Sequence, residues 1–98
     1  MRKYRVNIKP TAEEDLARRF VQIEAESLQD AVAWYLGIIE VIEKLDELAE
    51  RCPIAPEDAE IQKSIRHLMV GRYRVLYLIN NGCVDVLHVR HSRHDRRF

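Results

Sequence analysis

Arginine and histidine side chains, which bind phosphate groups and transfer protons near neutral pH, concentrate in the last third of this chain. Residues 63–98 carry eight Lys or Arg, two Asp or Glu and all four histidines, whereas residues 1–62 carry eight Lys or Arg and 14 Asp or Glu. The formal charge of zero therefore conceals one half of charge −6 and one of charge +6. This asymmetry predicts an anionic partner for one surface and a basic partner for the other, unless the two halves simply pack together.

Three of the histidines, His88, His91 and His94, recur at every third residue, which raises the question of a metal site. Their segment predicts a strand, in which successive side chains point to opposite faces, so this spacing does not bring three ligands together. We expect neither a metal nor another cofactor. His67 and His88 are interpreted as strand residues that are packed or hydrogen-bonded and have no functional role.

Length and composition place these residues in a single domain, residues 1–98, with an ordinary hydrophobic fraction of 47%. The N-terminal segment is charged, and no run of apolar residues is long enough to cross a membrane, so we expect a soluble, cytoplasmic protein. Cys52 and Cys83 lack a C-x-x-C or secretory context, which predicts free thiols in a reducing compartment.

The acidic half predicts a strand and then helices. Tyr4, Val6 and Ile8 alternate with polar residues, as in a strand with one buried face. Thr11 and Glu14 have the spacing of a capping box, which predicts that a helix begins near residue 12.

A second, longer helix is predicted from Ser27 to about residue 51. Its apolar face is broad, so it needs two packing partners, and an antiparallel helical hairpin on one face of a sheet supplies them. Pro53 then begins an acidic connector, residues 52–62, which we expect to be exposed and mobile.

The basic half predicts a three-stranded antiparallel meander over residues 64–70, 72–79 and 83–91, with turns at Gly71 and Asn81-Gly82. Arg72 and Arg74 share one face of the middle strand, and the tyrosines share the other. Because an unpaired buried charge is costly, we predict that both arginines face solvent and the tyrosines face the helices. The alternative for Arg74 is an ion pair with a carboxylate of the connector. Both faces of the last strand are partly apolar, so its buried face is undecided.

This α+β order, an N-terminal strand, a two-helix hairpin and a meander forming one sheet with helices on one face, resembles the RelE/ParE superfamily of bacterial toxins. The resemblance covers the whole chain. It is carried by V-G-R-Y-R-V-L-Y-L-I at residues 70–79 and V-L-H-V-R-H-S-R-H-D at residues 86–95, and is closer to the ParE-like branch. It implies a toxin of a type II toxin–antitoxin system, of the plasmid-stabilisation kind, that a cognate antitoxin neutralises. The fold alone does not separate the activities of this superfamily.

For a ParE-like toxin the resemblance implies inhibition of DNA gyrase through a basic C-terminal surface. The target-binding residues expected on this hypothesis are Arg72, Arg74, Arg90, His91, Arg93 and Arg96. The antitoxin-binding residues expected are Trp34, Tyr35 and Arg74. Self-association as a homodimer is left open, and because no predicted helix is basic, we expect no DNA recognition helix.

For a RelE-like toxin the resemblance implies metal-free cleavage of mRNA on the ribosome, which needs a base, an acid and cations around the scissile phosphate. The candidate catalytic residues are Lys63, Arg66, Arg74, His91 and Arg93, with His94 as a further tail candidate. The chain lacks a terminal tyrosine and keeps one lysine of the usual cluster, which favours the gyrase hypothesis. A third alternative is an inactive homologue that binds only the antitoxin. The sequence therefore leaves open whether the protein is an enzyme.

Overall fold

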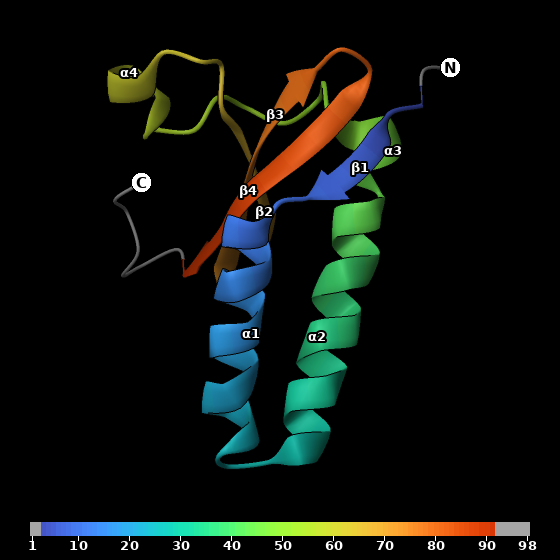
Figure 1. Ribbon diagram of the computed structural model, residues 1–98, viewed down its shortest axis with the longest axis vertical. Helices are drawn as coiled ribbons and strands as arrows, with labels where there is room; N and C mark the ends of the chain where they lie inside the picture. Colours follow the sequence, from blue (N-terminus) through green and yellow to red (C-terminus); the bar gives the residue numbers. More distant parts are fainter. Residues whose placement is uncertain (1–2, 92–98) are drawn as a thin grey trace.

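The computed structural model describes residues 3–91 and confirms the predicted α+β order (Figure 1). The elements are β1 (Arg5–Ile8), α1 (Pro10–Glu24), α2 (Leu28–Glu43), α3 (Leu45–Leu48), α4 (Asp58–Ile61), β2 (Arg66–Val70), β3 (Tyr73–Asn80) and β4 (Cys83–His91). No helix in the described part of the chain is long and apolar enough to span a membrane.

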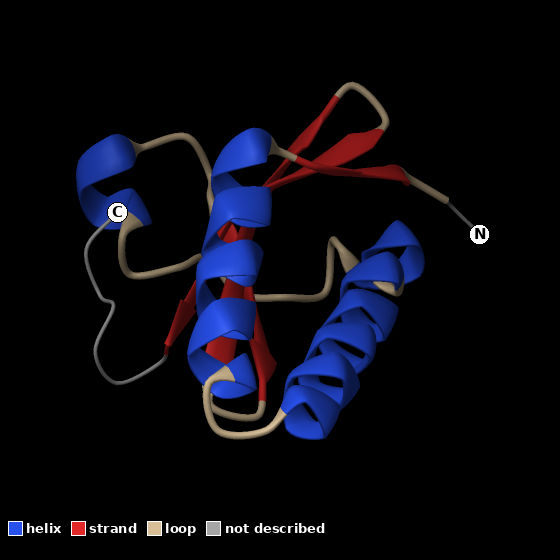
Figure 2. Cartoon of the chain, turned by 60° about the horizontal axis from the view of Figure 1, so that its bottom comes forward, coloured by secondary structure: helices blue, strands red, loops and turns tan. Residues whose placement is uncertain are grey.

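The four strands form one mixed sheet in the order β1-β4-β3-β2, in which β1 runs parallel to β4 and the other neighbours are antiparallel. The helices α1 and α2 lie side by side as a hairpin against one face of this sheet (Figures 1 and 2). Leu16 and Ile42 of the hairpin share the main core with Val75 and Tyr77 of β3. The prediction that the tyrosine face of the middle strand meets the helices is therefore confirmed.

The two predicted turns of the meander are present. Asn81 and Gly82 have φ angles of 48° and 78°, and Gly71 has a φ of 59°. Positive φ at both central residues is the geometry that matches the twist of a two-residue hairpin, which explains the Asn-Gly pair.

A β-bulge in β4 explains why the alternation of residues along this strand did not show which side chains are buried. Leu76 pairs with His88 but Tyr77 pairs with Val86, so Leu87 is the extra residue on β4. An extra residue reverses the alternation of faces. Val84, Val86 and Val89 therefore all lie in the core beneath the helices, although their numbers differ in parity.

The helix α1 covers the part of β4 that β1 leaves without a neighbouring strand. Pairing with β1 ends at Val86, and beyond it the hydroxyl of Thr11 donates to the carbonyl of Leu87 at 2.6 Å, while Asp15 Oδ2 accepts from the amide of Val89 at 3.0 Å. Side chains of a helix thus replace strand partners along an exposed edge. The predicted capping role of Thr11 is wrong, because the helix begins at Pro10 and Thr11 binds the sheet instead.

The second helix begins as predicted, with Ser27 Oγ accepting from the amide of Asp30 at 3.1 Å. It is shorter than predicted, because α2 ends at Glu43 and the chain re-forms a helical turn as α3. This break lets the last turn reach the sheet, where the Tyr77 hydroxyl donates to the carbonyl of Ala49 at 2.6 Å. Burial raises the pKa of the Tyr77 phenol far above its usual value.

The prediction that the connector is exposed is wrong for its middle part. Ala55 and Ile65 pack on Leu76 of β3, on the face of the sheet opposite the hairpin, and form a second small core. Asp58 Oδ1 holds the end of this segment by accepting from the amides of Lys63 and Ile65, and these bonds lower the pKa of Asp58. Both faces of the sheet are therefore covered around Leu76.

Candidate functional site

Arg74 is buried beneath the connector, so the prediction that it faces solvent is wrong. It lies on the face opposite the hairpin, as predicted, but only 3% of it is exposed. Its guanidinium forms a two-pronged ion pair with the carboxylate of Glu57, with NH1 to Oε1 at 3.0 Å. NH1 also lies 3.2 Å from Nδ1 of His67. The connector carboxylate considered as the alternative partner is therefore the observed one.

The ion pair of Glu57 perturbs the protonation of its carboxyl group. Burial alone would raise the pKa of Glu57, yet the hydrogen bond and the charge of Arg74 outweigh it and hold this pKa below its usual range. Arg74 and Arg90 are direct cross-strand partners, and like charges in that position repel. The carboxylate of Glu57 therefore supplies the counter-charge that lets one of these arginines be buried.

Among the residues that the structure describes, the nuclease candidates Lys63, Arg66 and Arg74 are not brought together. Arg66 and Arg74 pair with Tyr77 and Met69 respectively, which places the two arginines on opposite faces of the sheet. Arg66 NH1 donates to the carbonyls of Cys52, at 2.5 Å, and Glu50, at 3.5 Å, so it anchors the start of the connector. Lys63 is exposed next to α4.

Other predicted target-binding residues meet at one end of the sheet. Tyr73 is the cross-strand partner of His91, so Arg72, Arg90 and His91 lie at the end of the sheet where β3 begins and β4 ends, with Arg90 and His91 on opposite faces. Arg72 is exposed in the turn before β3, and Arg90 and His91 are partly exposed. Predicted residues Arg93 and Arg96, and His94, lie outside the described residues. We call Arg72, Arg90 and His91 the basic end of the sheet.

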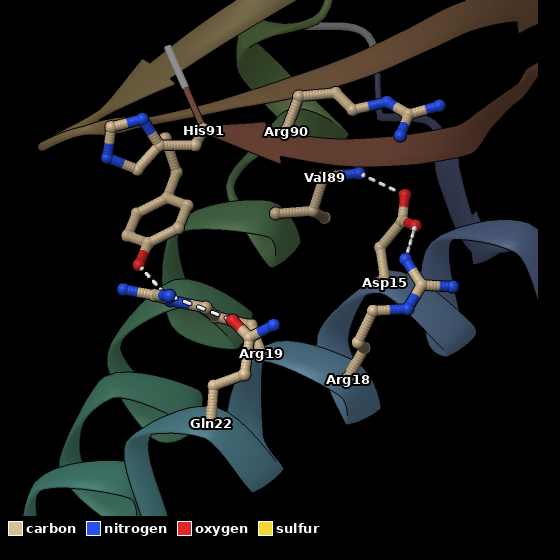
Figure 3. Close-up of a pocket in the computed structure, with 8 residues that line it drawn as sticks. Asp15, Arg18, Arg19, Gln22, Val89, Arg90 and His91 are labelled. Carbon is tan, nitrogen blue, oxygen red and sulfur yellow. Dashed lines mark hydrogen bonds and ion pairs between the residues drawn. The ribbon is translucent and has the colours of Figure 1, made fainter. Parts of the chain in front are cut away.

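A polar cavity of about 190 Å³ opens beside the basic end, between α1 and the last residues of β4 (Figure 3). Arg18 and Arg19 of α1 line it together with Tyr73, Arg90 and His91. In Figure 3, Arg90 lies on the other side of β4 from the side chain of Val89 and from Asp15 below it. Arg90 therefore points away from the space between Asp15 and β4.

The groups of this cavity are held by specific contacts. Arg19 Nε donates to the hydroxyl of Tyr73 at 2.6 Å and NH1 donates to Gln22 at 2.8 Å, and the guanidinium lies 5.6 Å from the centre of the Tyr73 ring. Arg18 contacts Asp15 at 3.4 Å and Glu14 at 3.1 Å. Arg18 is thus paired with two carboxylates, whereas Arg19 is held by neutral groups.

Sequence reasoning missed this contribution of α1. No functional role was predicted for Arg18 or Arg19. They are the one adjacent pair of basic residues in residues 10–62, which is otherwise strongly acidic. That local excess of positive charge was the signal available in the sequence. The position of Arg18 and Arg19 beside β4, however, depends on the tertiary packing of α1.

The helical hairpin also carries an exposed apolar surface. On α2 the large side chains Leu28, Val32, Tyr35 and Leu36 are between 39% and 61% exposed. Tyr35 packs edge-on against Phe20, with ring centres 6.2 Å apart, and lines a groove of about 640 Å³ whose other lining residues belong to α1 and to Ile8 of β1. An exposed cluster of this kind on a small domain is a candidate protein-binding surface.

Trp34 and Tyr35, predicted together as antitoxin-binding residues, point to different neighbours. Trp34 lies 5.5 Å from the ring of Tyr73 and lines a separate groove with Arg72 and Val70. Adjacent residues on a helix are about 100° apart, and here Trp34 and Tyr35 point to different sides of α2. Among the described residues, no group of His, Cys, Asp or Glu is arranged to hold a metal ion.

Comparison with known proteins gives the same fold and a family. Residues 6–96 match the family described as the ParE toxin of the type II toxin–antitoxin system parDE. None of the curated proteins matches the chain. Among solved structures, a chain of the chromosomal ParDE toxin–antitoxin system from P. aeruginosa superposes with a TM-score of 0.78 at 14% identity, covering 93% of this chain and 98% of that one.

Proposed function

Since this chain belongs to the ParE toxin family of type II toxin–antitoxin systems, we propose that it arrests growth by binding and inhibiting DNA gyrase, and that a cognate antitoxin neutralises it. The gyrase contact is assigned to the basic end of the sheet, Arg72, Arg90 and His91, continued in sequence by Arg93 and Arg96. The protein acts in the cytoplasm on this proposal, because its target works there on DNA.

The burial of Arg74 is the observation that carries the choice of gyrase over mRNA. Phosphodiester cleavage needs cationic groups that converge on one accessible phosphate. Arg74 is covered and paired with Glu57, and Arg66 is on the opposite face of the sheet. These positions support a toxin that binds its target, with Arg74 as a structural residue and not a target contact.

The exposed apolar surface of the hairpin supports the antitoxin half of the proposal. An amphipathic helix of the antitoxin would lay its apolar side chains against Tyr35 and Leu36 and into the neighbouring groove. The chain is acidic over residues 1–62, so basic residues flanking such a helix would be attracted to this half of the molecule. Trp34 is assigned to the rim of this contact, and Arg74 is dropped from it.

Two assays on the purified protein test the proposal. We expect inhibition of plasmid supercoiling by gyrase, or accumulation of cleaved DNA, while ribosome-bound mRNA in a translating extract stays intact. Codon-phased mRNA cuts would establish the endoribonuclease alternative instead. A protein that does neither, yet binds its antitoxin, would be an inactive homologue, and the proposal would be wrong.

A further inference from the structure

The groove that Trp34 lines lies between α2 and the segment where β2 turns into β3. Its volume is about 380 Å³, and its walls include Trp34, Gly37, Val70, Gly71 and Arg72. We propose that this groove binds an apolar segment of the antitoxin that carries one acidic side chain, and that this side chain pairs with Arg72. This assignment rests on the function proposed above and adds the chemistry of the partner.

Gly37 is the residue that carries the proposal. It is exposed in the interior of α2, where a glycine stabilises a helix less than an alanine does. Nothing in the described fold requires a glycine there, because its φ is not positive and a Cβ atom would meet no neighbour within 4 Å. The remaining use of a glycine is to let the backbone of a partner approach closely. Position 37 therefore points to another chain that packs against this side of α2.

The groove is continuous with the exposed apolar surface of the hairpin. Ala33 is exposed on α2, and its neighbours on the helix surface, three and four residues further on, are Leu36 and Gly37. An antitoxin segment that covers Leu36 can therefore cross α2 and enter the groove without leaving the protein surface.

Arg72 defines the polar group that the bound segment must carry. Its side chain is exposed and makes no hydrogen bond or ion pair with any residue that the structure describes. Arg66 and Arg74, by contrast, are engaged by a backbone carbonyl and by the carboxylate of Glu57. A carboxylate on the bound segment would form a two-pronged, charge-assisted pair with the guanidinium of Arg72.

Trp34 contributes a hydrogen-bond donor to the same wall. Its indole N–H is buried and has no acceptor within residues 3–91. The indole nitrogen can only donate, and buried donors in native proteins are rarely left unpaired. An oxygen atom of the bound segment would satisfy this donor.

A second copy of this chain fits the charges around the groove less well. The helix α2 carries Asp30, Glu40 and Glu43 and no Lys or Arg, and residues 1–62 as a whole are acidic. Two acidic hairpins would repel each other. An antitoxin segment can instead place its carboxylate at Arg72 and its basic residues beside α2.

Occupation of the groove would neutralise the toxin directly. Arg72 belongs to the basic end of the sheet, to which the gyrase contact is assigned, so a chain that covers Arg72 excludes gyrase from it. Antitoxin and gyrase should therefore compete for the toxin, and a mixture of all three should contain no ternary complex.

Calorimetric titration of the purified cognate antitoxin into variants of the full chain tests the groove. Gly37→Leu should unfold at the same or a higher temperature than the parent chain, because leucine is the better helix former, yet its affinity should fall at least about tenfold. Arg72→Gln should lower both the affinity and its dependence on salt. Ala59→Leu is the matched control, because Ala59 is exposed in α4 and does not line the groove, and it should bind like the parent chain.

A measurement on the unmodified chain does not depend on any variant folding. Trp34 is the only tryptophan of the chain, so the ¹⁵N-labelled toxin gives a single indole N–H signal. Unlabelled antitoxin should shift this signal together with the amide signals of Gly71 and Arg72. Shifts confined to Tyr35 and Leu36 would refute the groove as the binding site.

Other outcomes separate the groove from the function on which it rests. If the antitoxin neutralises gyrase inhibition by the parent chain but binds Gly37→Leu and Arg72→Gln equally well, the groove is refuted and the proposed function stands. A ternary complex with gyrase would refute the shared use of Arg72. A toxin dimer that Gly37→Leu dissociates would identify a second copy as the occupant. If the antitoxin does not bind the parent chain, both proposals are wrong.

Discussion

Glu57 and Arg74 form a buried ion pair that joins the connector to the centre of β3. Their side chains are each 3% exposed, and both oxygens of the carboxylate contact the guanidinium. Removing one member of such a pair leaves the other member as a buried charge without compensation. This lowers the stability of the fold more than the absence of both charges would.

Glu57→Gln should therefore destabilise the fold strongly. We expect the free energy of unfolding, measured by urea denaturation, to fall by about 3–5 kcal/mol. Glu60→Gln is the control, because Glu60 is exposed in the same short helix α4. A loss in Glu57→Gln no larger than in the control would show that the ion pair does not hold the connector.

Acid should remove the contribution of the same pair. Burial opposes the ionisation of Glu57, but Arg74 holds its pKa below the ordinary value of 4.5. A carboxyl group with a lowered pKa stabilises the folded state above its unfolded pKa, and this contribution is lost as the pH falls through its folded pKa. The stability difference between the parent chain and Glu57→Gln should therefore be constant above about pH 4.5 and shrink below it. A difference that persists unchanged in stronger acid would contradict this assignment.

Asp15→Ala should loosen the edge of β4. The amide of Val89 is buried and donates to Asp15, so the substitution leaves this donor without its acceptor. The expected loss of stability is about 1–3 kcal/mol, and hydrogen exchange of the Val89 amide should speed up. Glu24→Ala, an exposed position of the same helix, should leave that exchange rate unchanged.

Arg72→Glu tests the basic end of the sheet as the gyrase contact. Arg72 is exposed in a turn, so the fold should tolerate the change, while reversal of a charge at an interface should weaken binding. We expect the toxin concentration that half-inhibits supercoiling to rise about tenfold, equivalent to about 1.4 kcal/mol. Arg5→Glu, also exposed, should inhibit like the parent chain. Equal inhibition by both variants would remove Arg72 from the site.

Leu36→Glu tests the hairpin as the antitoxin surface. Leu36 is 61% exposed, so the variant should fold and remain toxic, but co-expression of the antitoxin should no longer rescue growth. The affinity measured by calorimetry should fall at least about tenfold, because a charge is placed in an apolar contact. Met69→Glu, at an exposed apolar position on β2, should be rescued normally. Full rescue of Leu36→Glu would place the antitoxin elsewhere.

The amino-acid sequence by itself determined the elements, because those depend on local chemistry. The Asn81-Gly82 turn, the Ser27 cap and the alternation along β3 each follow from properties of neighbouring residues. The segments at residues 70–79 and 86–95 then indicated the toxin family.

Only the tertiary structure decided how those elements present their charges. The bulge at Leu87 changes which residues of β4 are buried, and no alternation pattern reveals an extra residue. The burial of Arg74 requires Glu57, 17 positions earlier in the chain, and the polar cavity requires α1 to lie along the edge of β4. Electrostatic contacts of this kind depend on distances between remote segments, and these distances are fixed by the packing of the whole chain.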